Sequence, residues 1–469
     1  MSVFQQSFSF LPPQEETPNT GTPLERITAV LSQDLDFHGE DSAYASHNFH
    51  SFPAKYPPQL PRIFIQTLTQ PGEVVLDPMA GSGTTTLEAY LTGRQAIAFD
   101  IDPLALLLNR VKVSSLDKHV VGKTGFHIIQ KAQDAAQKRP DTLLHELAQI
   151  TDNASRQFID YWFTPQTQVE LMALRQTIAA IEEPTLRNFF WLTFSATIIT
   201  KTGGVSLALD LAHTRPHRAK IVYDSQGKVL MGAEFIDPKN SRQRYISKTL
   251  RPPIGEFEKR LQKNLNSIYR PPENGMLPRI GQGNAQNLPL VSESIDLIVT
   301  SPPYASNAID YMRAHKFSLV WMGYPINDLG KKRQEYIGGE SLSGFAFEPL
   351  PLFTQQVVSQ ISALDEKKGQ VLHRYYSEMM RTLREMYRVL KPGKTAVVVV
   401  GNSVMRGQDT KTAECLADIG REIGFLVPKI GVRQLDRNRR MMPAGHKVNK
   451  KSQIQQRMHE EYVIGFYKP

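Results

Sequence analysis

The sequence has a single cysteine, Cys415, which excludes several classes of protein. One thiol can form neither an intramolecular disulfide framework nor a cysteine-rich metal site. Long apolar runs are also missing, since the best candidate, Phe189 to Thr200, falls short of the roughly 18 uncharged residues of a membrane helix. The start, MSVFQQSFSF, lacks the charged region and apolar core of a secretory signal. These absences predict a soluble, cytoplasmic protein with no membrane partner.

The composition is that of a globular protein with a mild basic excess. Of the 469 residues 41% are hydrophobic and 22% charged, which predicts two to three domains, or one large domain with an insertion. Lysine and arginine exceed aspartate and glutamate by 55 to 46. Such an excess favours a nucleic-acid partner only where it is clustered. From Lys429 to Lys451 there are eight basic residues against one aspartate, so a cluster exists.

Strand-like and helical patterns alternate along the chain from Glu73 onward. A helix is expected from about Thr84 to Leu91 and another at 103–112. Buried strands are expected at 73–78, 95–100, 295–300, 395–401, 428–435 and 461–467. Strands separated by helices predict an α/β fold with a mostly parallel sheet covered on both faces.

Two regions fall outside this alternation. Residues 1–40 begin with a proline-rich polar stretch and are expected to form a disordered N-terminal tail and lead-in. Residues 113–280 are too long for a loop and are interpreted as an insertion, helical over its first two-thirds and looped and basic over the last. The insertion separates a first part of the α/β domain, 41–112, from a second part, 281–469.

A glycine-rich turn follows the first strand, in LDPMAGSGTTTLEA from Leu76 to Ala89. Glycines let a ligand approach the backbone, and the helix that follows offers unpaired N–H groups. No lysine follows the second glycine, so the turn is not a phosphate-binding P-loop. Asp100 closes the next strand, where an acid can accept hydrogen bonds from two ribose hydroxyls. Together the two features favour a nucleoside-containing ligand over a structural turn beside an exposed acid.

A second motif, VTSPPY from Val299 to Tyr304, also follows an apolar strand. Two prolines fix an extended backbone and leave carbonyls that can only accept hydrogen bonds. A hydroxyl precedes them and an aromatic ring follows, which suits a planar group bearing an amine. A proline turn beside a buried tyrosine is the structural alternative.

DPMAGSGTT followed by TSPPY resembles the motif pair of S-adenosylmethionine-dependent DNA amino-methyltransferases, which modify cytosine N4 or adenine N6. Three further segments resemble motifs of that family: HNFHSFPAKYPPQLPRIFI (47–65), GNAQNLP (283–289) and EMYRVLKPGKTAVVVVGNS (385–403). The resemblance covers about 41–112 and 281–469. It implies a Rossmann-like class I methyltransferase with a seven-stranded sheet, in a bacterial cytoplasm and associated with the nucleoid.

The resemblance also implies residue roles. The residues expected to bind S-adenosyl-L-methionine are Phe52, Ala54, Asp77, Pro78, Ala80, Gly81, Ser82, Gly83, Thr84, Asp100, Ile101, Asn284 and Ala285. Asn284 stands where many relatives have aspartate. Ser301, Pro302, Pro303 and Tyr304 are expected to hold the target base. Serine at the first of these positions is usual in cytosine-N4 enzymes and favours N4-methylcytosine.

The chemistry expected at this motif is direct methyl transfer to an exocyclic amine. Hydrogen bonds to the Ser301 hydroxyl and the Pro302 carbonyl would draw the amine nitrogen toward a tetrahedral geometry, so that positioning does most of the work. The base must first be flipped out of the duplex, with Tyr304 stacked on it. Cytosine-C5 methylation needs a nucleophilic cysteine, whereas Cys415 lies in a pattern typical of an amphipathic helix.

Contact with double-stranded DNA is expected at the basic loop after the strand at 428–435. Its candidate residues are Arg437, Arg439, Arg440, Lys447, Lys450 and Lys451. The loop is expected at the sheet edge where ligands bind, although a solvated charged loop is the alternative. The insertion is the favoured region for base recognition, with 323–370 as another candidate. Tyr161, Trp162 and Phe163 could contact bases, but core packing is the stronger interpretation.

Some questions stay open at this level. His47, His50 and His315 lack metal-ligand spacing, so no metal is assigned. The alternatives to cytosine N4 are adenine N6, an RNA or protein substrate, and a non-catalytic DNA-binding regulator on the same scaffold. A cognate restriction endonuclease, if one exists, would be a separate protein. Oligomeric state and recognition sequence cannot be read from the sequence.

Overall fold

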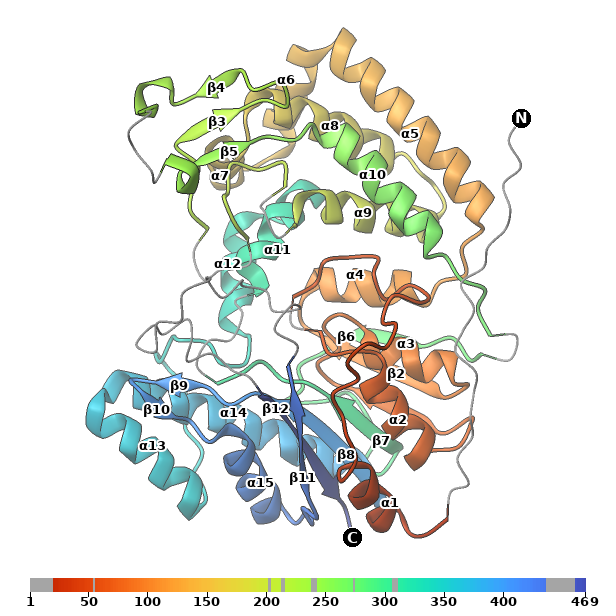
Figure 1. Cartoon of the computed structure of the whole chain (residues 1–469), viewed down its shortest axis with the longest axis vertical. Coiled ribbons are helices and arrows are strands. Elements are labelled where there is room, and N and C mark those ends of the chain that lie inside the picture. The colour runs from red at the N-terminus through yellow and green to blue at the C-terminus, as the bar shows by residue number, and fades with distance from the viewer. Residues whose placement is uncertain are drawn as a thin grey trace.

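The computed structural model describes residues 20–53, 55–200, 204–211, 216–237, 243–272, 275–305, 311–435 and 460–469. In Figure 1 a sheet with its flanking helices occupies the lower half, and the helices of the insertion arch over it in the upper half. Within the described ranges, no helix has the length and apolar character needed to cross a membrane.

A seven-stranded sheet is the centre of the lower half, with the order β11-β12-β8-β7-β1-β2-β6. Neighbouring strands are parallel except at β12, which runs antiparallel to both β8 and β11. The strands are β1 (Val74–Asp77), β2 (Gln95–Asp100), β6 (Arg279–Gln282), β7 (Ile295–Thr300), β8 (Leu390–Val400), β11 (Ile430–Gln434) and β12 (Glu460–Tyr467). The predicted α/β fold and each predicted strand are confirmed. The short polar strand β6 was not predicted.

Both faces of this sheet are buried, because successive strand residues point to opposite sides. In β7, Leu297 and Val299 pack with two helices on one face, while Ile298 packs with three helices on the other. The first pair is α1 (Pro23–Val30) and α2 (Gln59–Leu68); the second group is α13 (Leu352–Leu364), α14 (Glu366–Val389) and α15 (Thr412–Ile423). Burial on two faces is the reason why the strands are almost continuous apolar runs.

Helix α1 begins at Pro23, within the lead-in that was expected to follow a disordered tail, so the lead-in contains a helix. Thr22 and Glu25 form a capping box at the start of this helix. Ile27 and Leu31 then lie buried against the sheet. Their spacing of four residues was a helical signal, although it is short and follows a proline-rich stretch. Residues 1–19 lie outside the described part of the chain.

The insertion is a helical body with a small sheet at one end. Its helices are α5 (Lys118–Lys138), α6 (Pro140–Ile150), α7 (Asn153–Trp162), α8 (Pro165–Ala179), α9 (Pro184–Ile198) and α10 (Pro253–Asn266). Its other elements are β3 (Ile221–Tyr223), β4 (Val229–Met231), β5 (Ser247–Thr249), η1 (Ala233–Phe235) and η2 (Gln243–Tyr245). The helical first part is as predicted, but a looped last third is wrong, since α10 lies there. Phe257, Leu261 and Leu265 give α10 a buried stripe among many charges.

One apolar core joins the insertion to two helices of the α/β part, α4 (Pro103–Lys112) and α11 (Tyr311–Leu319). Phe163 is 1% exposed and packs edge-on against Trp321, so it serves the core as predicted. Tyr161 of the same sequence run is instead 53% exposed, with Arg218 over its ring at 4.8 Å. The remaining elements are α3 (Thr84–Leu91), η3 (Val320–Met322), α12 (Ile326–Gln334), β9 (Val404–Met405) and β10 (Gln408–Asp409).

Candidate active site

The carboxyl ends of β1, β2 and β7 border one pocket of about 850 Å³. Ligands bind at this edge of open α/β sheets. The predicted site residues that line it are Phe52, Asp77, Pro78, Ala80, Gly81, Ser82, Asp100, Ile101, Asn284, Ala285, Ser301 and Pro303. The structure therefore brings the glycine-rich turn, the strand-end acid and the first residue of the tetrapeptide into a single cavity.

Other predicted residues are placed differently. Gly83, Thr84, Pro302 and Tyr304 are described but do not belong to the lining of this pocket. Ala54 lies outside the described residues. The same holds for the predicted DNA contacts Arg437, Arg439, Arg440, Lys447, Lys450 and Lys451.

The glycines of the turn have separate tasks. Gly81 has φ +44° and Gly83 has φ +73°, a region that glycine enters without steric cost. Gly83 also faces Asn109, whose Oδ1 would lie 2.7 Å from an added Cβ. The amide of Asn109 donates back to the Gly81 carbonyl at 3.1 Å. Gly83 thus lets α3 pack closely against α4, while Gly81 forms the surface of the pocket.

Asp100 fastens the turn to the second strand. Its carboxylate accepts the Gly81 N–H at 2.7 Å and the Asp102 N–H at 2.9 Å. Burial, together with the neighbouring Asp102 carboxylate, raises the pKa of Asp100 to about 6. Each carboxylate oxygen can accept a second hydrogen bond, so Asp100 retains acceptor capacity for a diol.

Asp77 connects the turn to the tetrapeptide that begins at Ser301. Its Oδ1 accepts the Thr300 hydroxyl at 2.7 Å, and Thr300 directly precedes Ser301. The Asp77 side chain is nearly buried, and this burial raises its pKa to about 7. A carboxyl that titrates near neutrality at the edge of a pocket is typical of functional sites.

Several lining residues were not predicted. They are Pro53, Lys55, Tyr56, Met79, Asp102, Gly283, Tyr311, Glu335, Tyr336 and Ile337. Lys55 and Tyr56 belong to the segment 47–65, so its resemblance to a family motif was the available signal. Residues 335–337 follow α12 and carry no recognisable pattern, because only the folded chain brings them to the pocket.

An aromatic and histidine cluster forms one side of the pocket. Phe52 stacks on Tyr311 with ring centroids 5.5 Å apart and also contacts the His315 ring. Nδ1 of His315 lies 2.6 Å from Asp102 Oδ2, and both side chains are buried. Asp102 also caps α4 by accepting the Leu104 N–H at 2.8 Å. This pair joins the end of β2, beside the glycine-rich turn, to α11, which follows the tetrapeptide in the chain.

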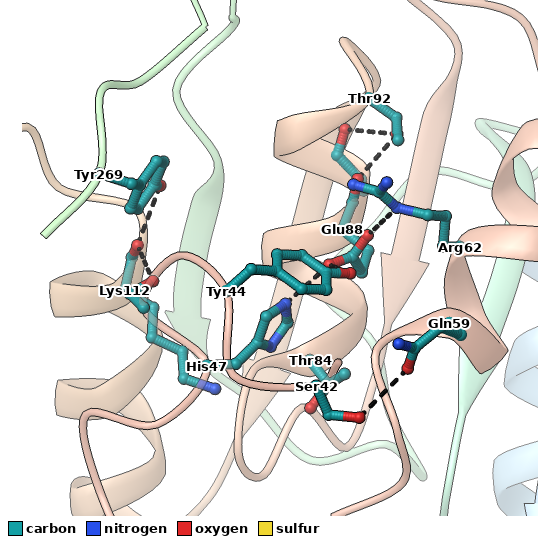
Figure 2. A network of polar contacts seen from close by, with 12 residues as sticks. Ser42, Tyr44, His47, Gln59, Arg62, Thr84, Glu88, Thr92, Lys112 and Tyr269 are labelled. Atoms are coloured by element: carbon teal, nitrogen blue, oxygen red, sulfur yellow. Dashed lines mark hydrogen bonds and ion pairs between the residues drawn. The ribbon is translucent and has the colours of Figure 1, made fainter. Parts of the chain in front are cut away.

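A buried network holds Tyr44, His47 and Arg62 against α3, as Figure 2 shows. Glu88 of α3 accepts a hydrogen bond from Tyr44 at 2.8 Å and lies 2.7 Å from His47 Nε2. Its second oxygen accepts from Arg62 at 2.6 Å. Glu88 is completely buried, so three partners compensate the cost of removing its charge from water. The network therefore fixes the chain on both sides of the pocket residue Phe52, at His47 and at Arg62.

Tyr304 is turned toward β12. Its hydroxyl donates to Glu461 Oε1 at 2.9 Å, while Ser301 and Pro303 of the same motif line the pocket. Burial, reinforced by the Glu461 charge, raises the pKa of Tyr304 well above its usual value, so the phenol stays protonated. Cys415 is completely buried in α15, and burial raises its pKa to about 12, which leaves no thiolate nucleophile there.

Comparison with known proteins agrees with this arrangement. The family model described as DNA methylase, for N6 and N4 methyltransferases, matches residues 25–108. The Type II methyltransferase M.MvaI of Kocuria varians is 23% identical over 395 residues, covering 80% of this chain and 81% of its own. M.AvaI of a Nostoc species, also a Type II methyltransferase, is 24% identical over 385 residues, covering 76% and 74%.

A solved S-adenosylmethionine-dependent methyltransferase from Methanosarcina mazei is 12% identical and covers 88% of this chain and 98% of its own, with a TM-score of 0.28. This score is too low to support a comparison of sites. The sheet topology and the pocket at its carboxyl edge define a Rossmann-like class I methyltransferase. Over these matched regions the chain is similar to S-adenosylmethionine-dependent amino-methyltransferases.

Proposed function

We propose that the protein transfers a methyl group from S-adenosyl-L-methionine to the exocyclic N4 amine of a flipped-out cytosine in double-stranded DNA. The observation that carries this proposal is the single pocket that holds both the glycine-rich turn with Asp100 and the tetrapeptide residues Ser301 and Pro303. A methyl donor and an amine acceptor have to meet in one cavity, and this arrangement provides it.

The lining residues fit the proposed cofactor. Asp77, Asp100, Asp102 and Glu335 face the pocket, and Lys55 is the one cationic residue among the described lining residues. An acidic pocket suits a ligand with positive charges, because opposite charges attract more strongly away from bulk water. S-adenosylmethionine, when bound, supplies a methyl group on a positively charged sulfonium.

The tetrapeptide supports chemistry on an amine. The Ser301 hydroxyl and the Pro302 carbonyl are hydrogen-bond acceptors for an N–H₂ group, and Pro302 has no N–H that could compete. Two acceptors that bind one amine would orient its lone pair away from them, toward the electrophile. Rate enhancement then comes from orientation rather than from a strong base.

Cytosine N4 is preferred to adenine N6 because Ser301 occupies the first position of the tetrapeptide, where serine is usual in the cytosine enzymes that this chain resembles. DNA is preferred to RNA or protein because the family model is that of a DNA methylase and the relatives are Type II methyltransferases. A cognate restriction endonuclease encoded separately is the partner that such relatives suggest.

The DNA backbone is proposed to lie along the pocket edge of the sheet. β11 runs parallel to β7, so its last residue, Gln434, lies at the edge where the pocket opens. The basic residues 437–451 follow directly in the chain and are proposed to neutralise phosphates. Replacing Arg437, Arg439 and Arg440 should weaken DNA binding and flatten its salt dependence while cofactor affinity stays unchanged.

Single-molecule sequencing of host DNA tests the reaction directly. Cells expressing the protein should acquire N4-methylcytosine at one short motif, and the Ser301→Ala variant should lose it. Ser359→Ala, on the exposed side of α13, is a matched control that should retain the mark. N6-methyladenine would correct the base but keep the chemistry. A protein that binds the cofactor and leaves no mark on DNA would contradict the proposal.

A further inference from the structure

Tyr304 belongs to a chain of polar contacts that ends outside the pocket. Its hydroxyl donates to Glu461 Oε1 at 2.9 Å. The second oxygen of Glu461 pairs with Arg433 Nη1 at 2.5 Å, and Arg433 Nε donates to the Leu35 carbonyl at 3.2 Å. The four residues come from the lead-in, the segment after β7, and two neighbouring strands, so only the folded protein assembles them.

Glu461 is held firmly at its place in this chain. Arg433 and Glu461 are directly opposite each other in the antiparallel β11–β12 pair. Their side chains are only 7% and 13% exposed, so their attraction is little screened by water. A carboxylate fixed by a buried guanidinium has little freedom to follow a moving partner, so its contact with Tyr304 defines where the phenol lies.

We propose that Glu461 is a positioning residue for methyl transfer, which fixes the ring of Tyr304 through the hydrogen bond to its hydroxyl. This inference rests on the proposed function and on the stacking of Tyr304 on the flipped-out base that the sequence analysis expects. A ring anchored at Cβ and at its hydroxyl keeps one orientation and needs no ordering when the base arrives. Immobilising a free side chain on binding costs about 0.5–1.5 kcal/mol, so an anchored ring captures the base more effectively.

The contact is strong enough to have a measurable effect. Hydrogen bonds to ionised acceptors are roughly twice as strong as neutral ones. The raised pKa of Tyr304 keeps its proton available for donation throughout the neutral range. Removing the hydroxyl or neutralising the carboxylate should therefore loosen the ring without removing it.

A double-mutant cycle on the full-length protein tests the proposal. Tyr304→Phe keeps the ring and removes its anchor, while Glu461→Gln keeps the shape and removes the charge. Each should lower kcat/KM for a DNA duplex about five- to tenfold, the fold-change expected from losing about 1 kcal/mol or slightly more. The affinity for S-adenosylmethionine should not change. The double variant should have the same kcat/KM as the less active of the two single variants, because both substitutions break the same contact.

The chain offers a matched control on the same strand. Tyr462 donates to Glu460 at 3.1 Å, a tyrosine–glutamate contact of the same kind that does not involve the tetrapeptide. Tyr462→Phe and Glu460→Gln should leave kcat/KM within twofold of the wild-type value. If these control variants lowered kcat/KM as much as Tyr304→Phe does, any disturbance of β12 would be enough to impair the enzyme, and the proposal would be overturned.

Other outcomes separate the possible failures. Wild-type protein that methylates no DNA would refute the proposed function itself. Active wild-type protein with an unaffected Tyr304→Phe variant would refute only the positioning role. If Glu461 merely fastens β11 to β12, Glu461→Gln should lower the thermal unfolding midpoint and act equally in the wild-type and Tyr304→Phe backgrounds. If Glu461→Gln does not fold, Tyr304→Phe alone decides, because it leaves the Arg433 pair intact.

Discussion

Replacing Lys112 by methionine should stabilise the protein. Lys112 lies in the last turn of α4 with 1% of its surface exposed. Among the described residues its Nζ has no hydrogen-bond partner, and Figure 2 shows the ammonium end beside His47 with no contact drawn to it. Burial, followed by repulsion from Lys55, lowers its pKa well below the usual 10.5. The amine is therefore buried, unpaired and disposed to be neutral.

The magnitude follows from the cost of an unsatisfied buried polar group, about 1–3 kcal/mol. Methionine keeps the unbranched stem and carries no donor. The backbone carbonyl of Lys112, which accepts from Ser46 and Tyr269 at 2.7 and 3.0 Å, is untouched by the change. Lys112→Met should therefore raise the free energy of unfolding by about 1–3 kcal/mol. Lys131→Met, at an exposed position of α5, is the control and should change it by less than about 0.5 kcal/mol.

The pH dependence of the free energy of unfolding provides a second test of the Lys112→Met variant. The folded-state pKa of Lys112 is lower than the unfolded value, so the unfolded chain binds more protons between the two values. The free energy of unfolding of the wild-type protein therefore rises with pH between these two pKa values. The advantage of Lys112→Met should shrink as the pH approaches 10.5. Urea unfolding at several pH values measures both effects. A destabilised variant, or an advantage independent of pH, would refute an unpaired amine.

Three more predictions concern the site and its support. Gly83→Ala should lower the free energy of unfolding by about 1–3 kcal/mol, because alanine is strained at φ +73° and its Cβ would approach Asn109. Gly122→Ala is the control, because its Cβ would meet no atom within 4 Å, and it should not destabilise the protein. Equal urea midpoints for the two variants would contradict this prediction. Affinity for S-adenosylmethionine, measured by calorimetry, should rise as the pH passes about 7, where Asp77 ionises, and Asp77→Asn should abolish that slope. Glu88→Gln should cost about 3–5 kcal/mol in thermal or urea unfolding, since the largely buried Arg62 guanidinium loses its countercharge. A loss below about 1 kcal/mol would show that the Arg62–Glu88 ion pair does not stabilise the fold.

The sheet was predictable because its signals are local. A strand buried on both faces is a short apolar run, as in IDLIVT, and the polar residues that end such runs mark the carboxyl edge. Asp77 and Asp100 end their strands and Ser301 directly follows one, so parallel pairing alone brings them together. β6 escaped prediction because Arg279–Gln282 is polar at both ends and pairs on one side only.

The rest of the site depends on contacts between distant segments. Nothing near Tyr336 indicates a binding role, because α12 brings it to the pocket only after the insertion and α11 have packed on one core. The contact of Tyr304 with Glu461 requires the register of β12, which no local pattern specifies. Likewise α10 was overlooked because its apolar stripe is narrow and lies among charged residues.

The place where the insertion enters the sheet has a consequence for how such enzymes can diversify. β2 and β6 are adjacent parallel strands, with Asp100 opposite Gln282, although the whole helical body lies between them in the chain. Doubling the length of a connection costs only about 0.6 kcal/mol in closure entropy. A different body could be inserted between these strands, provided it packs on α4 and α11, and Asp100 and Asn284 would still line the same pocket. The pocket at the sheet edge and the helical insertion can thus change independently in evolution.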